Sequence, residues 1–338
     1  MALTLRHHYY LYVKNALKIL ILVFLFSCSK RVASVDFEYV YIYTSLEDKA
    51  LLENVISEVL FNDIYYTPEA ESRYQPIWKT HQDFLNKPNH SKLMFISLSE
   101  PLDTTIDVIS NHLSQTISSK KNIFLIEDYF NNEQELIFLN YKDINALNND
   151  LLYHRDWILS IFDYNEKSNM EKVAYRAGTD DNLSSKINEI FNVKMRVPID
   201  YQIIKYDTLS NYIWLGRGFP YRWIFLFEDL EDYYINPGLA WSRLEDKFND
   251  ILDVEIFDYG AGFKNDPIKL KGVYGTKLTS ENATGGPFFS NIITSDGTDK
   301  VLVASGFVNF PGKSKVFHIK ELEYILSNIK YKGGYQNE

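Results

Sequence analysis

Residues 288–310 read FFSNIITSDGTDKVLVASGFVNF, and this stretch decides the fold of the second half of the chain. Two runs rich in β-branched and aromatic residues, 288–294 and 301–310, flank the polar segment SDGTD at 295–299. Short segments that contain Gly and Asp between two such runs are typical of β-hairpin loops. The stretch therefore predicts an antiparallel hairpin within a sheet.

Further strands and helices accompany this hairpin in the second half. Segments with strand character lie at 193–198, 201–206, 212–216, 223–227 and 271–279. Apolar side chains three or four residues apart predict helices that include residues 244–252 and 322–329. We expect residues 166–338 to form a C-terminal lobe on a mostly antiparallel sheet.

The first half alternates strands with helices, and we expect residues 37–165 to form an N-terminal lobe. A polar loop runs through Pro68, Pro76 and Pro88, and the polar segment 166–185 is either a loop or the break between the halves. The whole pattern predicts an α+β fold with two lobes of mixed, mostly antiparallel sheet and helices packed on one face. Strands are predicted at 37–43, 93–96, 123–126 and 135–139, and helices at 46–60, 106–117 and 143–162.

The N-terminus resembles a bacterial lipoprotein leader. Residues 19–26 are eight consecutive apolar residues behind Arg6, Lys14 and Lys18, too short to cross a bilayer core that needs about 20 residues. Leu25 and Ser27 place the only cysteine, Cys28, in a lipobox-like context, which implies cleavage before Cys28 and lipid attachment to its sulfur. We predict a signal peptide at 1–27 and a tether at 28–36.

The net charge restricts the partners of the chain. It carries 35 basic and 45 acidic residues, a formal charge of −10, and loss of the three leader cations makes this −13. Such a surface disfavours nucleic acid and anionic membranes, so the lipid must supply the membrane attachment. In some bacteria an aspartate directly after the lipidated cysteine retains a lipoprotein in the inner membrane, but here this residue is Ser29. No acidic cluster, which would resemble a surface-export signal, follows closely. We therefore predict that the protein is located at the periplasmic face of the outer membrane.

The local patterns of common catalytic and metal sites are missing from the sequence. It contains no G-x-x-x-x-G-K-[ST], G-x-G-x-x-G or G-x-S-x-G string. Without paired histidines or further cysteines, a zinc site lacks its usual ligands, and His154, on an apolar helical stripe, is expected to be a core or boundary residue. We therefore predict no cofactor, no metal and no catalytic residue. The histidines of the mature chain are His81, His90, His112, His154 and His318.

Two residue classes leave alternatives open. The carboxylates at 228–232 and 180–181 are either solvated surface or part of a pair that could hydrolyse a glycan. The tryptophans either fill the core between sheet and helix or line a glycan or peptide groove. They are Trp78, Trp157, Trp214, Trp223 and Trp241.

The C-terminal third contains the strings GGPFFS at 285–290, GFVNFP at 306–311 and LEYIL at 322–326, with VPIDY, YIWL and KGVYG before them. In these strings the chain resembles a Bacteroidota-type lipoprotein family known as domain of unknown function four-eight-three-seven. The family has no assigned activity, so the resemblance implies a location in the cell envelope but no reaction. From the residues themselves we expect a tight turn before the strand at 288 and a bulge or close approach at Gly306. The family-motif positions are Gly285, Gly286, Pro287, Phe288, Gly306 and Pro311.

Two hypotheses for function follow. The first is a non-catalytic, lipid-anchored envelope protein that binds another envelope protein or a glycan, or assists assembly. The alternative is a lipid-anchored hydrolase that acts on cell-wall or glycan substrates through paired carboxylates.

Overall fold

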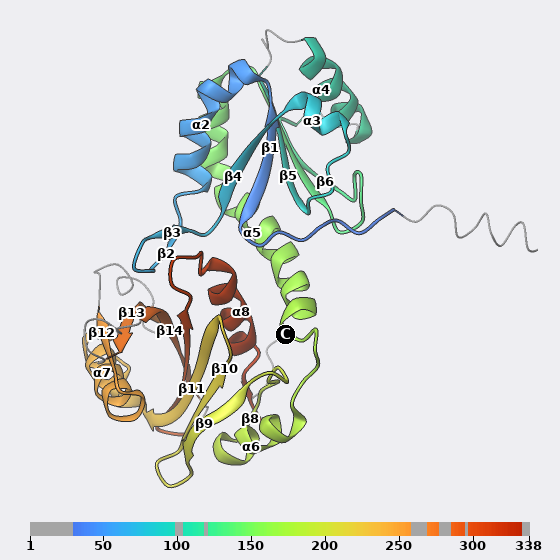
Figure 1. Ribbon diagram of the computed structural model, residues 1–338. Helices are drawn as coiled ribbons and strands as arrows, with labels where there is room; N and C mark the ends of the chain where they lie inside the picture. The colour runs from blue at the N-terminus through green and yellow to red at the C-terminus, as the bar shows by residue number, and fades with distance from the viewer. Residues whose placement is uncertain are drawn as a thin grey trace, which may run out of the picture.

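A computed structural model of the chain has two lobes connected by one long helix (Figure 1). The structure describes residues 30–98, 104–117, 121–257, 269–276, 285–294 and 297–332. The apolar run at 19–26 and Cys28 lie outside the described residues. In the described part of the chain, no helix combines the length and the hydropathy needed to cross a membrane.

The N-terminal lobe is built on a sheet in which four strands run parallel and one edge strand runs antiparallel. Parallel neighbours need a crossover, and α2 (Leu46–Leu60) supplies the one between β1 and β4. α2 begins after Ser45, whose side chain accepts a hydrogen bond from the Asp48 N–H. In sheet order the strands are β4 (Gln75–Thr80), β1 (Tyr39–Thr44), β5 (Lys92–Leu98), β7 (Glu135–Tyr141) and β6 (Ile123–Glu127).

Helices cover both faces of this sheet. α2 and α5 (Ile144–Ala174) pack on one face, and α3 (His81–Leu85) and α4 (Thr104–Ile117) pack on the other. All residues of β5 are buried because its side chains enter the apolar layer on each side. The predicted α+β class is confirmed, but the expectation of helices on one face is wrong, since continuous apolar runs such as β5 are buried on both faces.

Two segments predicted as irregular are regular in the structure. Within the predicted polar loop, β4 pairs residue by residue with β1, and Pro76 is tolerated because β4 is an edge strand. Residues 166–174, predicted as a loop or break, continue α5 as a helix. The predicted lobe boundary at residues 165 and 166 therefore falls inside this helix.

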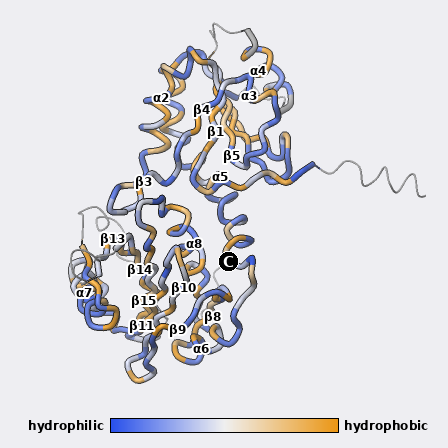
Figure 2. The backbone as a smooth tube through the Cα atoms, in the orientation of Figure 1, coloured by the Kyte–Doolittle hydropathy of each residue, from blue (hydrophilic) through white to orange (hydrophobic). Residues whose placement is uncertain are grey.

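The C-terminal lobe contains an antiparallel sheet with the predicted hairpin near its centre. Thr294 of β14 pairs with Val301 of β15, which confirms the hairpin predicted from residues 288–310. Figure 2 shows the most hydrophobic residues gathered on the strands inside each lobe. In sheet order the strands are β12 (Val254–Phe257), β13 (Lys269–Thr276), β14 (Gly285–Thr294), β15 (Lys300–Asn309), β11 (Tyr221–Leu230), β10 (Tyr212–Arg217) and β9 (Gln202–Asp207).

This second sheet is also covered on both faces. α6 (Asp181–Phe191) and α8 (Val316–Ser327) pack on one face, and α7 (Pro237–Leu252) packs on the other. Short elements complete the fold: the pairs β2 with β3 and β8 with β16, and one 3-10 turn. Their bounds are β2 (Ile64–Tyr65), β3 (Glu71–Ser72), β8 (Val193–Lys194), β16 (Lys330–Tyr331) and η1 (Glu231–Tyr233).

Helix α5 and the β2–β3 hairpin bring the lobes together. α5 begins in the N-terminal lobe and runs to the C-terminal lobe, where it packs against α8 (Figure 1). The β2–β3 hairpin also reaches the second lobe, where Glu71 accepts a 2.8 Å hydrogen bond from the Lys315 N–H and contacts its Nζ at 3.2 Å. Lys315 directly precedes α8, so the hairpin contacts the start of that helix.

Candidate functional site

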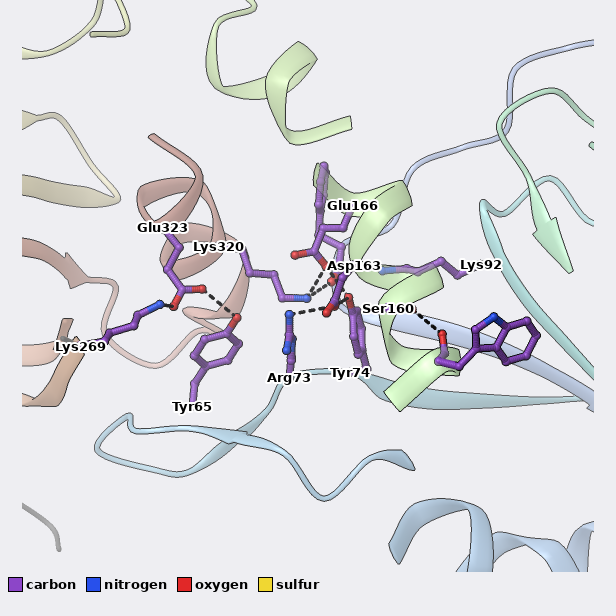
Figure 3. Close-up of polar contacts among 12 residues, drawn as sticks. Tyr65, Arg73, Tyr74, Lys92, Ser160, Asp163, Glu166, Lys269, Lys320 and Glu323 are labelled. Atoms are coloured by element: carbon purple, nitrogen blue, oxygen red, sulfur yellow. Dashed lines mark hydrogen bonds and ion pairs between the residues drawn. The ribbon is translucent and has the colours of Figure 1, made fainter. Parts of the chain in front are cut away.

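A cluster of ionisable side chains lies between the two lobes, and its two lysines are buried (Figure 3). We call it the interface cluster. Its members come from the chain just before β4, from the start of β5, from the middle of α5 and from α8, so four distant segments meet there. They are Arg73, Tyr74, Lys92, Asp163, Glu166 and Lys320.

Glu166 is at the centre of this cluster. Lys320 Nζ donates to Glu166 Oε2 at 2.7 Å and to the Phe37 carbonyl at 2.6 Å, which links α8 to both α5 and the chain before β1. Lys92 Nζ lies 3.9 Å from the same carboxylate oxygen. The side chains of Lys92 and Lys320 are 1% and 2% exposed, so both ammonium groups are removed from water.

Tyr74 connects the carboxylates with the cations. Its hydroxyl lies 2.8 Å from Asp163 Oδ1 and 2.9 Å from Glu166 Oε2, and Arg73 Nη2 donates to Asp163 Oδ1 at 2.8 Å. The Tyr74 ring centroid is 4.5 Å from Lys92 Nζ and 4.0 Å from the Lys320 ammonium, within cation–π range. The tyrosine thus partly replaces water around two buried charges.

Burial lowers the pKa of both lysines. Together with repulsion from Lys320, it lowers the pKa of Lys92 to about 7, against the attraction of Glu166. Burial also lowers the pKa of Lys320, although Glu166 opposes this change. Lys92 Nζ has no hydrogen-bond partner among the described residues, which is costly for a buried amine.

Glu135 lies beside this cluster, at the start of β7. It pairs in register with Lys92 on β5, and burial together with repulsion from Glu127 raises its pKa to about 8, against the attraction of Lys92. Glu135 lines an open pocket of about 230 Å³, which we call the Glu135 pocket. The other lining residues are Glu127, Asp128, Glu133, Gln134, Tyr164, Asn165, Ser168 and Asn169.

The Glu135 pocket offers acid–base chemistry but no recognised metal site. A carboxyl group that keeps its proton near neutral pH beside a second carboxylate is the arrangement in which one group serves as a general acid. Within the described ranges, no group of three or more His, Cys, Asp or Glu side chains is arranged to hold a metal ion.

A second polar contact crosses the interface under the family-motif residues. Tyr65 of β2 donates to Glu323 Oε2 at 3.2 Å, and Lys269 Nζ donates to Glu323 Oε1 at 2.7 Å (Figure 3). The enclosed space there measures only about 10 Å³, enough for about one water molecule. Pro287, Phe288 and Gly306 are among its lining residues, so these motif positions face a closed interface rather than a substrate cleft.

The two glycines at the start of β14 permit close backbone packing. Gly285 and Gly286 already lie in the strand, which differs from the tight turn that we expected. A Cβ atom would come within 2.2 Å of the Tyr274 carbonyl oxygen at Gly285 and within 2.0 Å of the Val308 carbonyl oxygen at Gly286. Neither approach is possible for a real side chain, so these positions require glycine.

The other family-motif residues surround the same strands. At Gly306, a Cβ atom would come within 2.8 Å of Phe289 and 3.2 Å of Leu322, so a close approach of α8 explains this glycine. Phe288 is buried in the apolar layer under α7, and Pro311 follows β15 in a turn. Cys28, the predicted lipidation site, lies outside the described residues.

The remaining sequence candidates are mostly structural. Asp229 pairs with Arg243, Glu228 with Lys300, and Asp180 caps α6 by accepting from the Leu183 N–H. Of the tryptophans, Trp214, Trp223 and Trp241 pack against the core beneath α7, and Trp78 packs against the core beneath α2 and α5. Trp157 differs, because 40% of it is exposed.

Sequence reasoning did not find Lys92 and Glu135. Each is a charged residue directly before an apolar run, LMFI and LIFL, and both strands are buried. Charged residues at such positions normally reach solvent at the end of a strand. A signal was therefore present at both positions, but the environment of Lys92 also depends on Lys320 of the second lobe, and that of Glu135 on residues of α5.

Comparison with known proteins gives one family match. The model of the family described as domain of unknown function (DUF4837) matches residues 251–328. This match confirms the resemblance predicted from the motifs at 285–290, 306–311 and 322–326. The DUF4837 segment runs from the end of α7 to just beyond α8, and it contributes Lys320 and Glu323 to the lobe interface.

Other comparisons add little. No curated protein sequence matches the chain. Among solved structures, the Ran-binding protein Mog1p of Saccharomyces cerevisiae is 10% identical, with 41% of this chain and 89% of that chain covered and a TM-score of 0.30. LpqN of Mycobacterium tuberculosis, described as involved in cell envelope biogenesis, is 12% identical over 40% of this chain and 81% of that chain, with a TM-score of 0.26. Both TM-scores are too low to carry a functional argument.

Proposed function

We propose that the chain is a lipid-anchored protein of the bacterial envelope, attached through Cys28 at the periplasmic face of the outer membrane. We further propose that it is a non-catalytic binding or assembly component there. The leader and the lipobox-like residues support the anchor, and the DUF4837 match is compatible with an envelope protein of unknown function.

One observation carries the non-catalytic role. The interface cluster brings several ionisable groups together, yet the side chains of Lys92 and Lys320 are only 1% and 2% exposed. A substrate cannot reach these two ammonium groups while the lobes are in contact. The cluster therefore forms a rigid contact between the lobes and keeps their outer surfaces in a constant arrangement.

Metabolic labelling with a fatty acid tests the anchor. We expect label in the wild-type protein and none in Cys28→Ala, because the lipid is attached to the cysteine sulfur. Ser27→Ala is the matched control, since it keeps a small residue before the cleavage site and should be labelled normally. Equal labelling of wild type and Cys28→Ala would disprove the anchor.

The Glu135 pocket favours a second candidate function, a lipid-anchored glycan hydrolase. Glu135 with its pKa raised to about 8 would donate a proton to the leaving group, and Glu127 would act as base or nucleophile. The test is the release of reducing ends from purified cell-wall glycan by wild type and Glu135→Gln. Release by wild type that is lost in the variant would establish the hydrolase and overturn the non-catalytic role.

A further inference from the structure

An open groove lies on the N-terminal lobe where α5 passes the start of β6. Its volume is about 740 Å³, within the usual range for sites that hold small organic ligands. We call it the α5 groove. Its lining residues are Lys121, Asn122, Ile123, Asp150, Tyr153, His154 and Trp157.

Aromatic rings dominate one wall of the α5 groove. Tyr153 is 84% exposed and Trp157 is 40% exposed, so both rings present apolar surface to water. The His154 ring lies edge-on to Tyr153 at 4.9 Å and to Trp157 at 6.1 Å between centroids. Apolar ring surface left in water is unfavourable, and such surface beside a groove is typical of ligand sites.

Polar groups also line the groove, Asp150 on α5 beside the rings and Asn122 directly before β6, and they provide hydrogen-bonding capacity without net charge. Asn122 carries an amide that can both donate and accept, and Asp150 supplies a carboxylate that already accepts from the Tyr141 hydroxyl. His154 Nε2 lies 3.6 Å from Asp150 Oδ1, so the ring and the carboxylate are neighbours in the groove. The formal charges of Lys121 and Asp150 cancel, which favours an uncharged ligand.

We propose that the α5 groove binds a glycan chain. A pyranose ring has one face of C–H bonds and a rim of hydroxyl groups, so it matches exposed aromatic rings flanked by a carboxylate and an amide. A membrane surface would instead require several basic residues, and the groove has one lysine. This inference rests on the proposed envelope location and names the ligand class for the binding role.

Binding to chito-oligosaccharide, a soluble β-1,4-linked N-acetylglucosamine tetramer, tests the proposal. The lipidated protein, purified in mild detergent, is titrated by calorimetry and also sedimented with purified peptidoglycan sacculi. We expect Trp157→Ala to weaken tetramer binding roughly 10-fold, as removal of one stacking ring usually costs about 1.4 kcal/mol. Leu152→Ala is the matched control, because Leu152 is 58% exposed on the same helix and does not line the groove.

The possible results separate the alternatives. Absence of tetramer and sacculus binding by the wild type overturns the groove proposal, and so does equal binding by wild type and Trp157→Ala. Sacculus binding that needs Trp157, without any tetramer binding, would assign the groove to the peptide stems and overturn the sugar assignment. Circular dichroism of each variant checks that it is folded. Fatty-acid labelling is a separate readout, so the anchor can fail while glycan binding stands, and the reverse.

Discussion

Replacement of Glu135 by glutamine should remove a pH dependence of stability that is built into the start of β7. Burial and Glu127 raise the pKa of Glu135 from its usual 4.5 to about 8 in the folded chain. Between these values the folded chain holds the proton and the unfolded chain does not. The contribution to stability is therefore complete below pH 4.5 and is lost as the pH rises through about 8.

The size of this effect follows from the pKa of Glu135. One pKa unit corresponds to about 1.4 kcal/mol, so the rise from 4.5 to about 8 corresponds to at most about 5 kcal/mol. Because the Glu135 pocket is open to solvent, we expect water to reduce the loss to about 3 kcal/mol. Glu135→Gln is isosteric and stays neutral at every pH, so the variant should not show this loss.

Urea unfolding at about pH 5 and about pH 8.5, followed by tryptophan fluorescence, measures the difference. Wild type should lose more unfolding free energy between the two pH values than Glu135→Gln. Glu127→Gln should show an intermediate loss, because it removes the charge that raises the pKa of Glu135. Glu53→Gln, an exposed change on α2, should behave like wild type. The same pH dependence in wild type and Glu135→Gln would refute the reasoning.

The remaining predictions concern the interface cluster and β14. Lys320→Met should lower the unfolding free energy by about 3–5 kcal/mol because it leaves the Glu166 carboxylate without its 2.7 Å partner, and a double-mutant cycle with Glu166→Gln should show strong coupling. Lys92→Met should raise the urea midpoint, most clearly below about pH 7, where the buried amine would otherwise be charged; a lower midpoint would contradict this. Gly286→Ala should prevent stable folding, since its Cβ would lie 2.0 Å from a backbone oxygen, whereas Gly275→Ala meets only an ordinary 3.4 Å contact and should keep the wild-type thermal midpoint within a few degrees.

Local sequence patterns predicted much of the fold. The runs at 37–43, 93–96 and 135–139 form β1, β5 and β7, because β-branched and aromatic residues fit a buried, pleated surface. Strand direction and the number of covered faces could not be predicted from single segments, since pairing depends on distant partners. The continuous apolar run of β5 did indicate burial on both faces, but the prediction of a mostly antiparallel sheet covered on one face did not take it into account.

The candidate sites were harder to predict than the fold. Trp157 was one of five tryptophans, and only the structure separates it from those that pack against the cores. Lys92 and Lys320 are 228 positions apart in sequence, and each depends on Glu166 from a third segment. No local sequence pattern predicts these contacts, because the position of one lobe against the other determines which charged side chains are buried.

α5 connects the lobes and also sets the spacing and orientation of their contacts. Glu166 binds Lys320, and five positions later Glu171 binds Arg196 at 2.5 Å and the Tyr324 hydroxyl. One rigid helix therefore positions several polar contacts with the second lobe. Each residue of a helix adds about 1.5 Å of length and about 100° of rotation. Insertion of a single residue in α5 before Glu166 would therefore rotate Glu166 and Glu171 away from their partners in the second lobe. Substitutions can accumulate along this helix, but its length between the two lobes is fixed by geometry.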